Sequence, residues 1–146
     1  MFAGRYEYSI DDKSRVSIPA KFREALSQSA DSRLILTNLD GCIAAYPYQE
    51  WLNIQDKVST PSPMRKETRA FLRYFYSGAT ECSLDKLGRV LIPQTLKTDA
   101  HIQKNVVIIG VGKKIEVWAK EKWEELVRLA TADPDQIADI VSELGL

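Results

Sequence analysis

The sequence predicts a mixed α+β fold of short strands and short helices, arranged as two half-size units that pack together. The main observation is a repeat. Residues 9–23 read SIDDKSRVSIPAKFR and residues 83–97 read SLDKLGRVLIPQTLK, with six identities in fifteen positions at a constant offset of 74. The shared frame is Asp-x-x-x-Arg-Val-x-Ile-Pro. A chain of 146 residues suits one compact domain or two small ones, and the repeat favours two units.

Each copy of the frame predicts a strand, a tight turn, a second strand and a short helix. Apolar alternation on both sides of Asp11 indicates half-buried strands, and the turn between them carries aspartate and arginine. Gly88 suits a positive φ in the second turn, whereas Ser14 occupies that position in the first and would be slightly strained there. Pro19 and Pro93 cannot donate to a ladder but suit the first position of a helix.

The first unit continues with a helix, a hairpin and another helix. The expected elements are a helix over residues 20–26, strands over 33–37 and 42–46 around a turn at 38–41, and a helix over 50–58 after Pro47. The second unit repeats this tail, with strands over 106–109 and 114–118 around a turn at 110–113. The duplication therefore covers whole folding units.

A linker helix is expected between the units. Ser62 is its predicted cap, Pro63 lies in its first turn, and the helix ends near Tyr76, before Gly78. One face is apolar (Met64, Phe71, Leu72, Phe75) and the basic residues lie elsewhere (Arg65, Lys66, Arg69, Arg73). This basic set either contacts phosphate or is a solvated face of the linker.

Two helices are expected after the second unit, over residues 120–130 and from a cap at Asp133-Pro134 onward. The last helix carries an apolar stripe that suits packing on the core or on a neighbouring subunit (Ile137, Ile140, Val141, Leu144). The expected boundaries are unit one at 5–51, linker helices at 52–78, unit two at 79–122 and C-terminal helices at 123–146.

Charge is balanced over the chain but unevenly placed. The 20 basic and 20 acidic residues give a net charge of zero, which does not by itself indicate nucleic-acid binding. Residues 57–73 carry five basic side chains and one acidic, whereas residues 113–146 carry five basic and eight acidic. This asymmetry allows a locally positive surface on a neutral chain.

The composition is that of an ordinary globular protein, with 45% hydrophobic and 27% charged residues. The apolar runs are too short to span a bilayer, and the opening MFAGRYEYS lacks the apolar core of a signal peptide. We therefore expect a cytoplasmic protein with no membrane partner. Cys42 and Cys82 are expected to be buried free thiols, because two cysteines make neither a disulfide scaffold nor a four-ligand zinc site.

No enzyme, cofactor or metal site is expected. The paired aspartates Asp11 and Asp85 invite comparison with aspartic proteases, but each has an arginine four residues on that favours the ionised form. His101 is the only histidine, expected on the surface or in a loop, so no multi-histidine metal site is possible. The segment Gly110-Val-Gly-Lys-Lys lacks the spacing of a phosphate-binding loop, and its glycines are expected in a hairpin turn.

The Asp–Arg pairs have two interpretations. Such a pair can simply brace a turn, or the aspartate can orient an arginine that binds phosphate or the acceptor edge of guanine. The second is favoured because both residues persist in the two copies while the three residues between them vary. The predicted DNA-binding residues, including a lysine at each tip, are Asp11, Lys13, Arg15, Asp85, Lys86 and Arg89.

Four features together resemble the MraZ family of bacterial transcriptional regulators, which is associated with the division and cell-wall gene cluster. They are the opening MFAG, the two Asp-x-x-x-Arg motifs, Ile-Pro-Ala-Lys-Phe-Arg after the first, and Tyr-Pro-x-x-x-Trp at residues 46–51. The resemblance extends from residue 1 to about residue 130, and the acidic C-terminal helix is the least family-like stretch.

The resemblance implies two tandem AbrB-like (SpoVT-type) units, mainly β with short helices, forming swapped-hairpin, double-split β-barrel units in one pseudo-symmetric protomer. It also implies a ring-shaped homo-oligomer that binds short direct repeats of double-stranded DNA upstream of its own operon, usually as a repressor, in the nucleoid. The family's signature aspartates and arginines fall on Asp11, Asp85, Arg15 and Arg89, and its usual glycine is Gly88 in the second copy but Ser14 in the first.

One turn presents only one or two positive charges, which is too few for useful affinity to DNA. A ring of several subunits would multiply the phosphate contacts and so raise the affinity. An alternative from another class is a ring-forming scaffold or protein-interaction module whose turns bind an acidic protein without preference for any DNA sequence.

Overall fold

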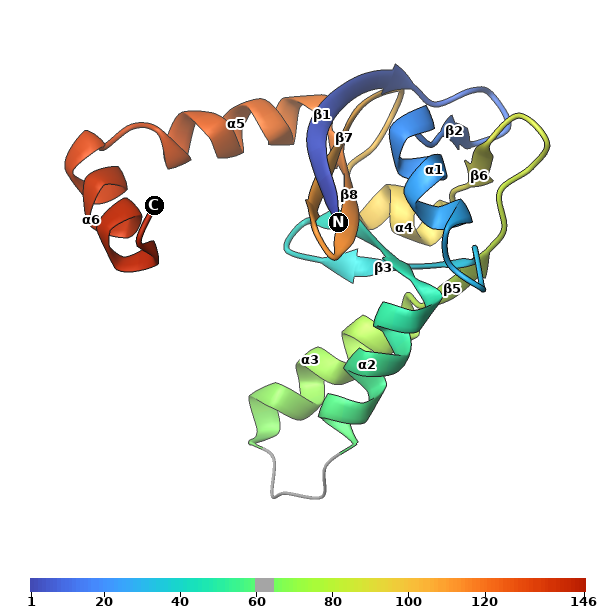
Figure 1. Cartoon of the computed structure of the whole chain (residues 1–146), viewed down its shortest axis with the longest axis horizontal. Helices are drawn as coiled ribbons and strands as arrows, with labels where there is room; N and C mark the ends of the chain where they lie inside the picture. The colour runs from blue at the N-terminus through green and yellow to red at the C-terminus, as the bar shows by residue number, and fades with distance from the viewer. Residues whose placement is uncertain (60–64) are drawn as a thin grey trace.

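The computed structural model describes residues 1–59 and 65–146, and the order of elements is the same in both repeats (Figure 1). The first repeat comprises β1 (Phe2–Ser9), β2 (Arg15–Ser17), α1 (Ala20–Ser27), β3 (Leu34–Leu39), β4 (Cys42–Pro47) and α2 (Tyr48–Val58). After the linker helix α3 (Lys66–Ser77), the second repeat comprises β5 (Thr80–Cys82), β6 (Arg89–Leu91), α4 (Gln94–Asp99), β7 (Asn105–Gly112), β8 (Lys114–Ala119) and α5 (Lys120–Ala130). The helix α6 (Pro134–Leu144) follows.

Strands of the two repeats are interleaved in the sheets. The six-stranded antiparallel sheet has the order β1-β7-β8-β4-β3-β5, and β2 pairs with β6 in a separate two-stranded ladder. The first strand of each repeat therefore pairs with the hairpin of the other, β1 with β7 and β5 with β3. The α+β fold built from tandem units is confirmed. The domain boundaries at 5–51, 52–78, 79–122 and 123–146 stay a prediction. Both units contribute strands to one sheet, so the sheet does not mark where one unit ends and the next begins.

The core contains the repeated apolar positions of both copies. Val16 and Val90 face it from the two-stranded ladder, and Phe22 and Leu96 face it from α1 and α4. The ring of Phe22 meets those of Phe2 and Tyr6 edge-on at centroid distances of 5.5 and 5.4 Å. The same apolar frame that marks the repeat therefore anchors both turns to one core.

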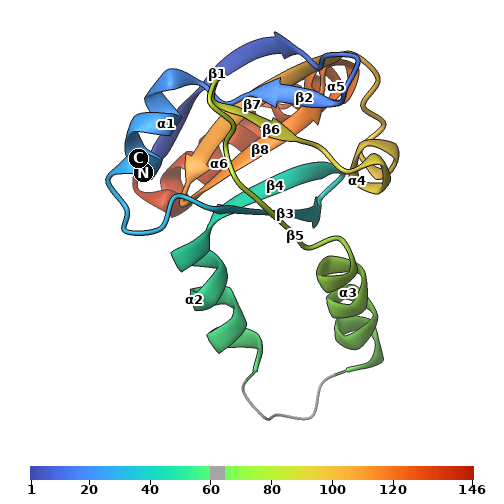
Figure 2. The same cartoon turned by 90° about the vertical axis from the view of Figure 1, so that its right-hand side faces the viewer.

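The helices α2 and α3 form a hairpin that extends away from the sheet, whereas α5 and α6 form an arm that leaves the body elsewhere (Figures 1 and 2). Trp51 of α2 and Phe75 of α3 stack at 5.4 Å, and the hydroxyl of Thr37 donates a hydrogen bond to the carbonyl of Phe75. The predicted helix start at Ser62, Pro63 and Met64 lies outside the described residues. Arg65 occupies the N-cap position of α3 without a capping hydrogen bond from its side chain.

Both hairpin turns are tighter than expected. The first is Asp40-Gly41 with positive φ at both residues, as a two-residue turn of this type requires, so β3 continues to Leu39. The second is Gly112-Lys113, and the expectation that Gly110 lies in a turn was wrong. Gly110 lies in β7 opposite Gly4, where a Cβ would be 2.4 Å from the backbone nitrogen of Ala3, so the close approach of β1 requires glycine.

The predicted cap of the last helix is confirmed. Asp133 caps α6 by accepting the N–H groups of Asp135 and Gln136, with Pro134 in the first turn. Both cysteines are free thiols, and Cys42 is buried as expected. Cys82 was expected to be buried but is only half-buried, because it lies on β5 at the edge of the sheet. Among the described helices, none has the length and apolar character needed to cross a membrane.

Candidate nucleic-acid interface

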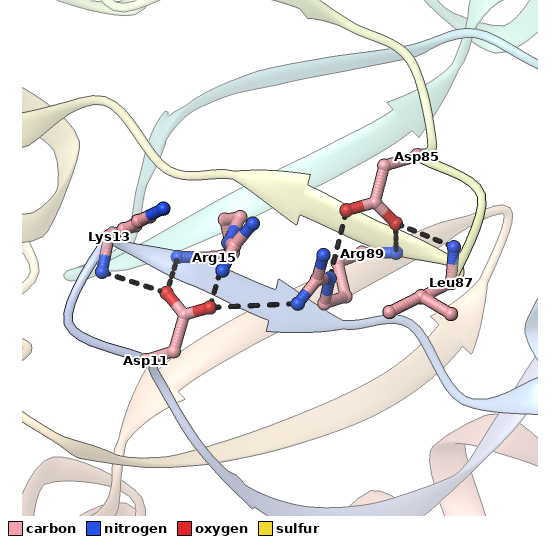
Figure 3. Close-up of polar contacts among 6 residues, drawn as sticks. All are labelled: Asp11, Lys13, Arg15, Asp85, Leu87 and Arg89. Atoms are coloured by element: carbon pink, nitrogen blue, oxygen red, sulfur yellow. Dashed lines mark hydrogen bonds and ion pairs between the residues drawn. The ribbon is translucent and has the colours of Figure 1, made fainter.

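Each Asp-x-x-x-Arg turn is held by its own aspartate (Figure 3). In the first turn Asp11 Oδ1 accepts the N–H groups of Lys13 at 3.0 Å and Arg15 at 2.8 Å, and Oδ2 accepts Nε of Arg15 at 2.8 Å. The backbone closes the same loop, because the N–H of Asp11 donates to the carbonyl of Arg15 at 2.9 Å. One carboxylate thus fixes the turn and orients the arginine.

The second turn repeats this geometry. Asp85 Oδ1 accepts the N–H groups of Leu87 at 2.9 Å and Arg89 at 2.8 Å, and Oδ2 accepts Nε of Arg89 at 2.8 Å. In both turns the aspartate holds Nε, so the Nη groups of each guanidinium keep N–H donors that can bind a further acceptor.

The residue before each arginine has the left-handed conformation that the sequence predicted. Ser14 has a φ of 61° and Gly88 a φ of 76°. For a residue with a side chain this conformation costs about 1 kcal/mol, so the first turn is strained and the second is not.

The ladder between β2 and β6 brings the turns together. Arg15 lies opposite Leu91 and Arg89 opposite Ser17. Beyond the ladder, the N–H of Ile92 donates to the carbonyl of Ser14 at 2.8 Å, and the N–H of Ile18 donates to the carbonyl of Gly88 at 2.9 Å. Each turn is therefore positioned by the other repeat.

The two arginines also share one carboxylate. Nη1 of Arg89 lies 3.9 Å from Asp11 Oδ2, the oxygen that accepts Nε of Arg15. Both guanidinium groups are partly exposed, with 31% of the Arg15 side chain and 25% of the Arg89 side chain accessible to solvent. They form one surface feature contributed by both repeats.

Both aspartates are held in the ionised form. The pKa of Asp11 is lowered mainly by the N–H of Arg15 and then by its guanidinium, against the effect of partial desolvation. The pKa of Asp85 is lowered in the same way by Arg89. From the sequence we predicted that the arginine side chain keeps the aspartate ionised. In the structure the backbone N–H of the arginine lowers the aspartate pKa more than its side chain does. Two carboxylates with lowered pKa values are unsuited to sharing a proton as in an aspartic protease.

The two predicted lysines occupy different positions in their turns. Lys13 is the third residue of the first turn, where the second turn has Leu87, and Lys86 aligns with Asp12. Both lysines are exposed. Leu87 and, on β6, Leu91 are exposed apolar residues that the sequence did not single out.

Two further basic residues, Arg23 and Lys97, lie at the turns. Lys97 Nζ of α4 donates to the hydroxyl of Ser14 at 2.9 Å, and Arg23 of α1 lies against Gly88, where a Cβ would be 2.5 Å from its Cδ. Each helix therefore places a basic side chain on the turn of the other repeat. The signal was present in the sequence, since Arg23 and Lys97 align as a similar pair at the repeat offset.

This arrangement makes the surface locally positive. Six basic and three acidic residues lie in or against the two turns (Lys13, Arg15, Arg23, Lys86, Arg89, Lys97; Asp11, Asp12, Asp85). The basic face of α3 lies elsewhere, on the hairpin that extends away from the end bearing the turns (Figures 1 and 2).

The geometry gives no indication of a metal centre. Within residues 1–59 and 65–146, no cluster of three or more His, Cys, Asp or Glu side chains could hold a metal ion. His101 is an exposed residue with a φ of 56°, as expected for a loop position.

Comparison with known proteins gives a consistent result over the whole chain. A family profile described as "MraZ protein, putative antitoxin-like" matches residues 1–74 and again residues 75–139. The chain is 48% identical over 147 residues to a protein named transcriptional regulator MraZ from Clostridium tetani, with 100% of each covered. It is 44% identical to proteins of the same name from Pelotomaculum thermopropionicum and Clostridium beijerinckii, with at least 99% of each chain covered.

Proposed function

The chain belongs to the MraZ family, and from this premise we propose that it is a transcriptional regulator that binds double-stranded DNA through its two Asp-x-x-x-Arg turns. Its targets are short direct repeats upstream of its own operon in the division and cell-wall gene cluster. It acts there as a ring-like homo-oligomer, as a repressor, in the cytoplasm at the nucleoid. It is not an enzyme and needs no cofactor.

The observation that carries this proposal is the pair of arginines held side by side by ionised aspartates (Figure 3). A planar guanidinium whose Nε is already engaged presents its Nη edge in a fixed orientation. Such a group binds a phosphate or the O6 and N7 atoms of guanine with little loss of side-chain entropy. The short β2–β6 ladder holds both arginines on one backbone support, as readout of neighbouring base pairs requires.

Affinity comes from repetition of this surface. The local excess of three positive charges per chain is modest, because counterion release scales with the number of phosphates contacted. Several copies bound to successive repeats raise the effective concentration of each further turn. A repeated operator therefore matches the repeated DNA-binding surface of the proposed oligomer, and affinity should depend on assembly.

A second function is favoured by one observation, the exposed Leu87 and Leu91 beside the second arginine. An apolar residue next to a basic group also fits an acidic protein partner, as in a ring-forming scaffold without specific DNA binding. On DNA, the same leucines would contact thymine methyl groups in the major groove. Dependence on base sequence separates the two.

The test is binding to a labelled duplex from the region upstream of the gene, beside a scrambled duplex, at two salt concentrations. We expect a preference for the native duplex that persists at the higher salt, because base contacts survive the screening of phosphate contacts. Lys113→Ala is the matched control, since it removes an exposed charge at the β7–β8 turn. Equal binding of both duplexes that vanishes with salt would favour the scaffold.

A further inference from the structure

The arm formed by α5 and α6 exposes large apolar residues along its length. No residue of α5 or α6, both of which lie wholly within the described part of the chain, is buried. Ile140 is 46% exposed and Leu144 66% exposed on the stripe of α6. Helices of 11 residues gain most of their stability from packing an apolar face, so this stripe needs a partner.

A second exposed apolar surface lies on α3. Phe71 is 46% exposed and Tyr74 is 41% exposed, and the ring of Phe71 stacks on the buried Phe75 at 5.6 Å. We call Phe71 and Tyr74 the aromatic face of α3. Large aromatic side chains anchored by a buried neighbour are typical of protein interfaces.

The arm and the aromatic face cannot meet within one chain. The α2–α3 hairpin and the α5–α6 arm leave the body at different places and point in different directions (Figures 1 and 2). A contact between them must therefore involve two copies.

The charges of the two surfaces are opposite. Residues 65–77 carry four basic side chains and one acidic (Arg65, Lys66, Arg69, Arg73; Glu67). Residues 131–146 carry four acidic side chains and no basic one (Asp133, Asp135, Asp139, Glu143). Opposite net charges favour the encounter of arm with hairpin and disfavour the pairing of two arms or two hairpins.

We propose that the α5–α6 arm of one copy packs its apolar stripe on the aromatic face of α3 in a second copy. This inference rests on the proposed function, because it assigns the surface through which the DNA-binding oligomer assembles. The contact is heterologous, so each copy uses its arm on one neighbour and its hairpin on the other, and the chain of contacts closes into a ring or continues as a filament. Neither surface includes the turns at Arg15 and Arg89, which stay accessible in the assembly.

The test uses two variants of the full chain that each break one half of the contact. Ile140→Asp/Leu144→Asp alters the arm, and Phe71→Glu/Tyr74→Glu alters the hairpin. By light scattering we expect a multimer for the wild type and a monomer for each variant. Val111→Asp is the matched control, because it places a charge at an exposed valine of β7 and should leave the multimer unchanged.

Mixing the two variants decides between contact types. The arm variant retains an intact hairpin and the hairpin variant an intact arm, so an equimolar mixture should form one-to-one dimers and nothing larger. A mixture that stays monomeric would overturn the proposal, because an intact arm and an intact hairpin would then fail to bind each other. A hairpin variant that dimerises on its own would overturn it in favour of arm-to-arm pairing. Variants that assemble like the wild type would overturn it as well.

Two further measurements keep the outcomes distinct. If Phe71→Glu/Tyr74→Glu unfolds, Arg65→Glu/Arg73→Glu replaces it, since both side chains are exposed, and we expect about a tenfold weaker association at low salt. Binding to the native duplex is measured in parallel on each sample. If the wild type assembles by this contact but shows no preference for the native duplex, the proposed function alone is refuted. If the variants still assemble and bind the native duplex normally, the contact alone is refuted.

Discussion

The two turns have the same geometry but different sequences, and the difference separates what builds the turn from what tunes it. Corresponding hydrogen bonds to Asp11 and Asp85 agree within 0.1 Å. The intervening residues are Asp-Lys-Ser in the first turn and Lys-Leu-Gly in the second. Aspartate and arginine therefore suffice for the shape.

The intervening residues set charge and strain. The first turn, residues 11–15, has two acidic and two basic residues, whereas the second, residues 85–89, has one acidic and two basic residues. The first has a strained serine whose hydroxyl accepts a hydrogen bond from Lys97, and the second has an unstrained glycine beside Arg23. We infer that the second turn contributes more to phosphate binding.

The largest expected effect is loss of specific DNA binding when either arginine is removed. Arg89→Ala should lower affinity for the native duplex by about a hundredfold or more, because a bidentate base contact contributes about 1–3 kcal/mol per site and the oligomer repeats it. Arg15→Ala should have a smaller effect, because its turn carries no net positive charge. Titration of the native duplex at fixed salt measures both.

The conservative variant Arg89→Lys keeps the charge but lacks the planar fork, so it should retain binding to the scrambled duplex and lose the preference for the native one. Unfolding of either alanine variant, or loss of its assembly, would instead mean that the pair only braces the turn.

The next effect concerns stability and compares the two residues with positive φ, Ser14 in the first turn and Gly88 in the second. Gly88→Ala should destabilise the fold by about 1–2 kcal/mol, because alanine is strained at a φ of 76° and its Cβ displaces Arg23. Ser14→Gly should change stability by less than about 1 kcal/mol, because relief of strain is offset by the lost bond from Lys97 and by a more flexible unfolded chain. Urea unfolding midpoints measure both, and equal effects would show that the strain at Ser14 is negligible.

A third effect depends on pH. The folded state lowers the pKa of Asp11 and Asp85 below the ordinary 3.8, so the stability they contribute is present above that pH and is lost as pH falls through their folded pKa values. Thermal unfolding from about pH 6 to about pH 2.5 should show a drop at the acidic end for the wild type. The Asp11→Asn/Asp85→Asn variant should show a smaller drop, and an unchanged acid profile would mean that other carboxylates dominate.

Local features of the site were predictable from the sequence, and contacts between repeats were not. The Asp–Arg pairs and the positive φ at Ser14 and Gly88 follow from residues within a few positions of one another. The prolines expected at the first helical position lie one residue earlier, at the N-caps of α1 and α4. The contact from Lys97 to Ser14 joins residues 83 apart and depends on how the repeats interleave.

The error at Gly110 has the same origin. Its role is set by β1, whose backbone approaches it from the other end of the chain, and no local signal distinguishes that close approach from a turn glycine. Interleaving therefore determines which residues reach the site.

The smallest effect concerns the lysines at the tips. Lys86→Ala and Lys13→Ala each remove one exposed charge, so each should weaken binding a few-fold on both duplexes and reduce the slope of log affinity against log salt by about one per contacting turn. Lys86 lies in the turn with net positive charge, whereas Lys13 is adjacent to Asp12. We therefore expect the larger change of slope for Lys86→Ala. A larger change for Lys13→Ala would place the first turn closer to the phosphates and reverse the assignment of roles to the two turns.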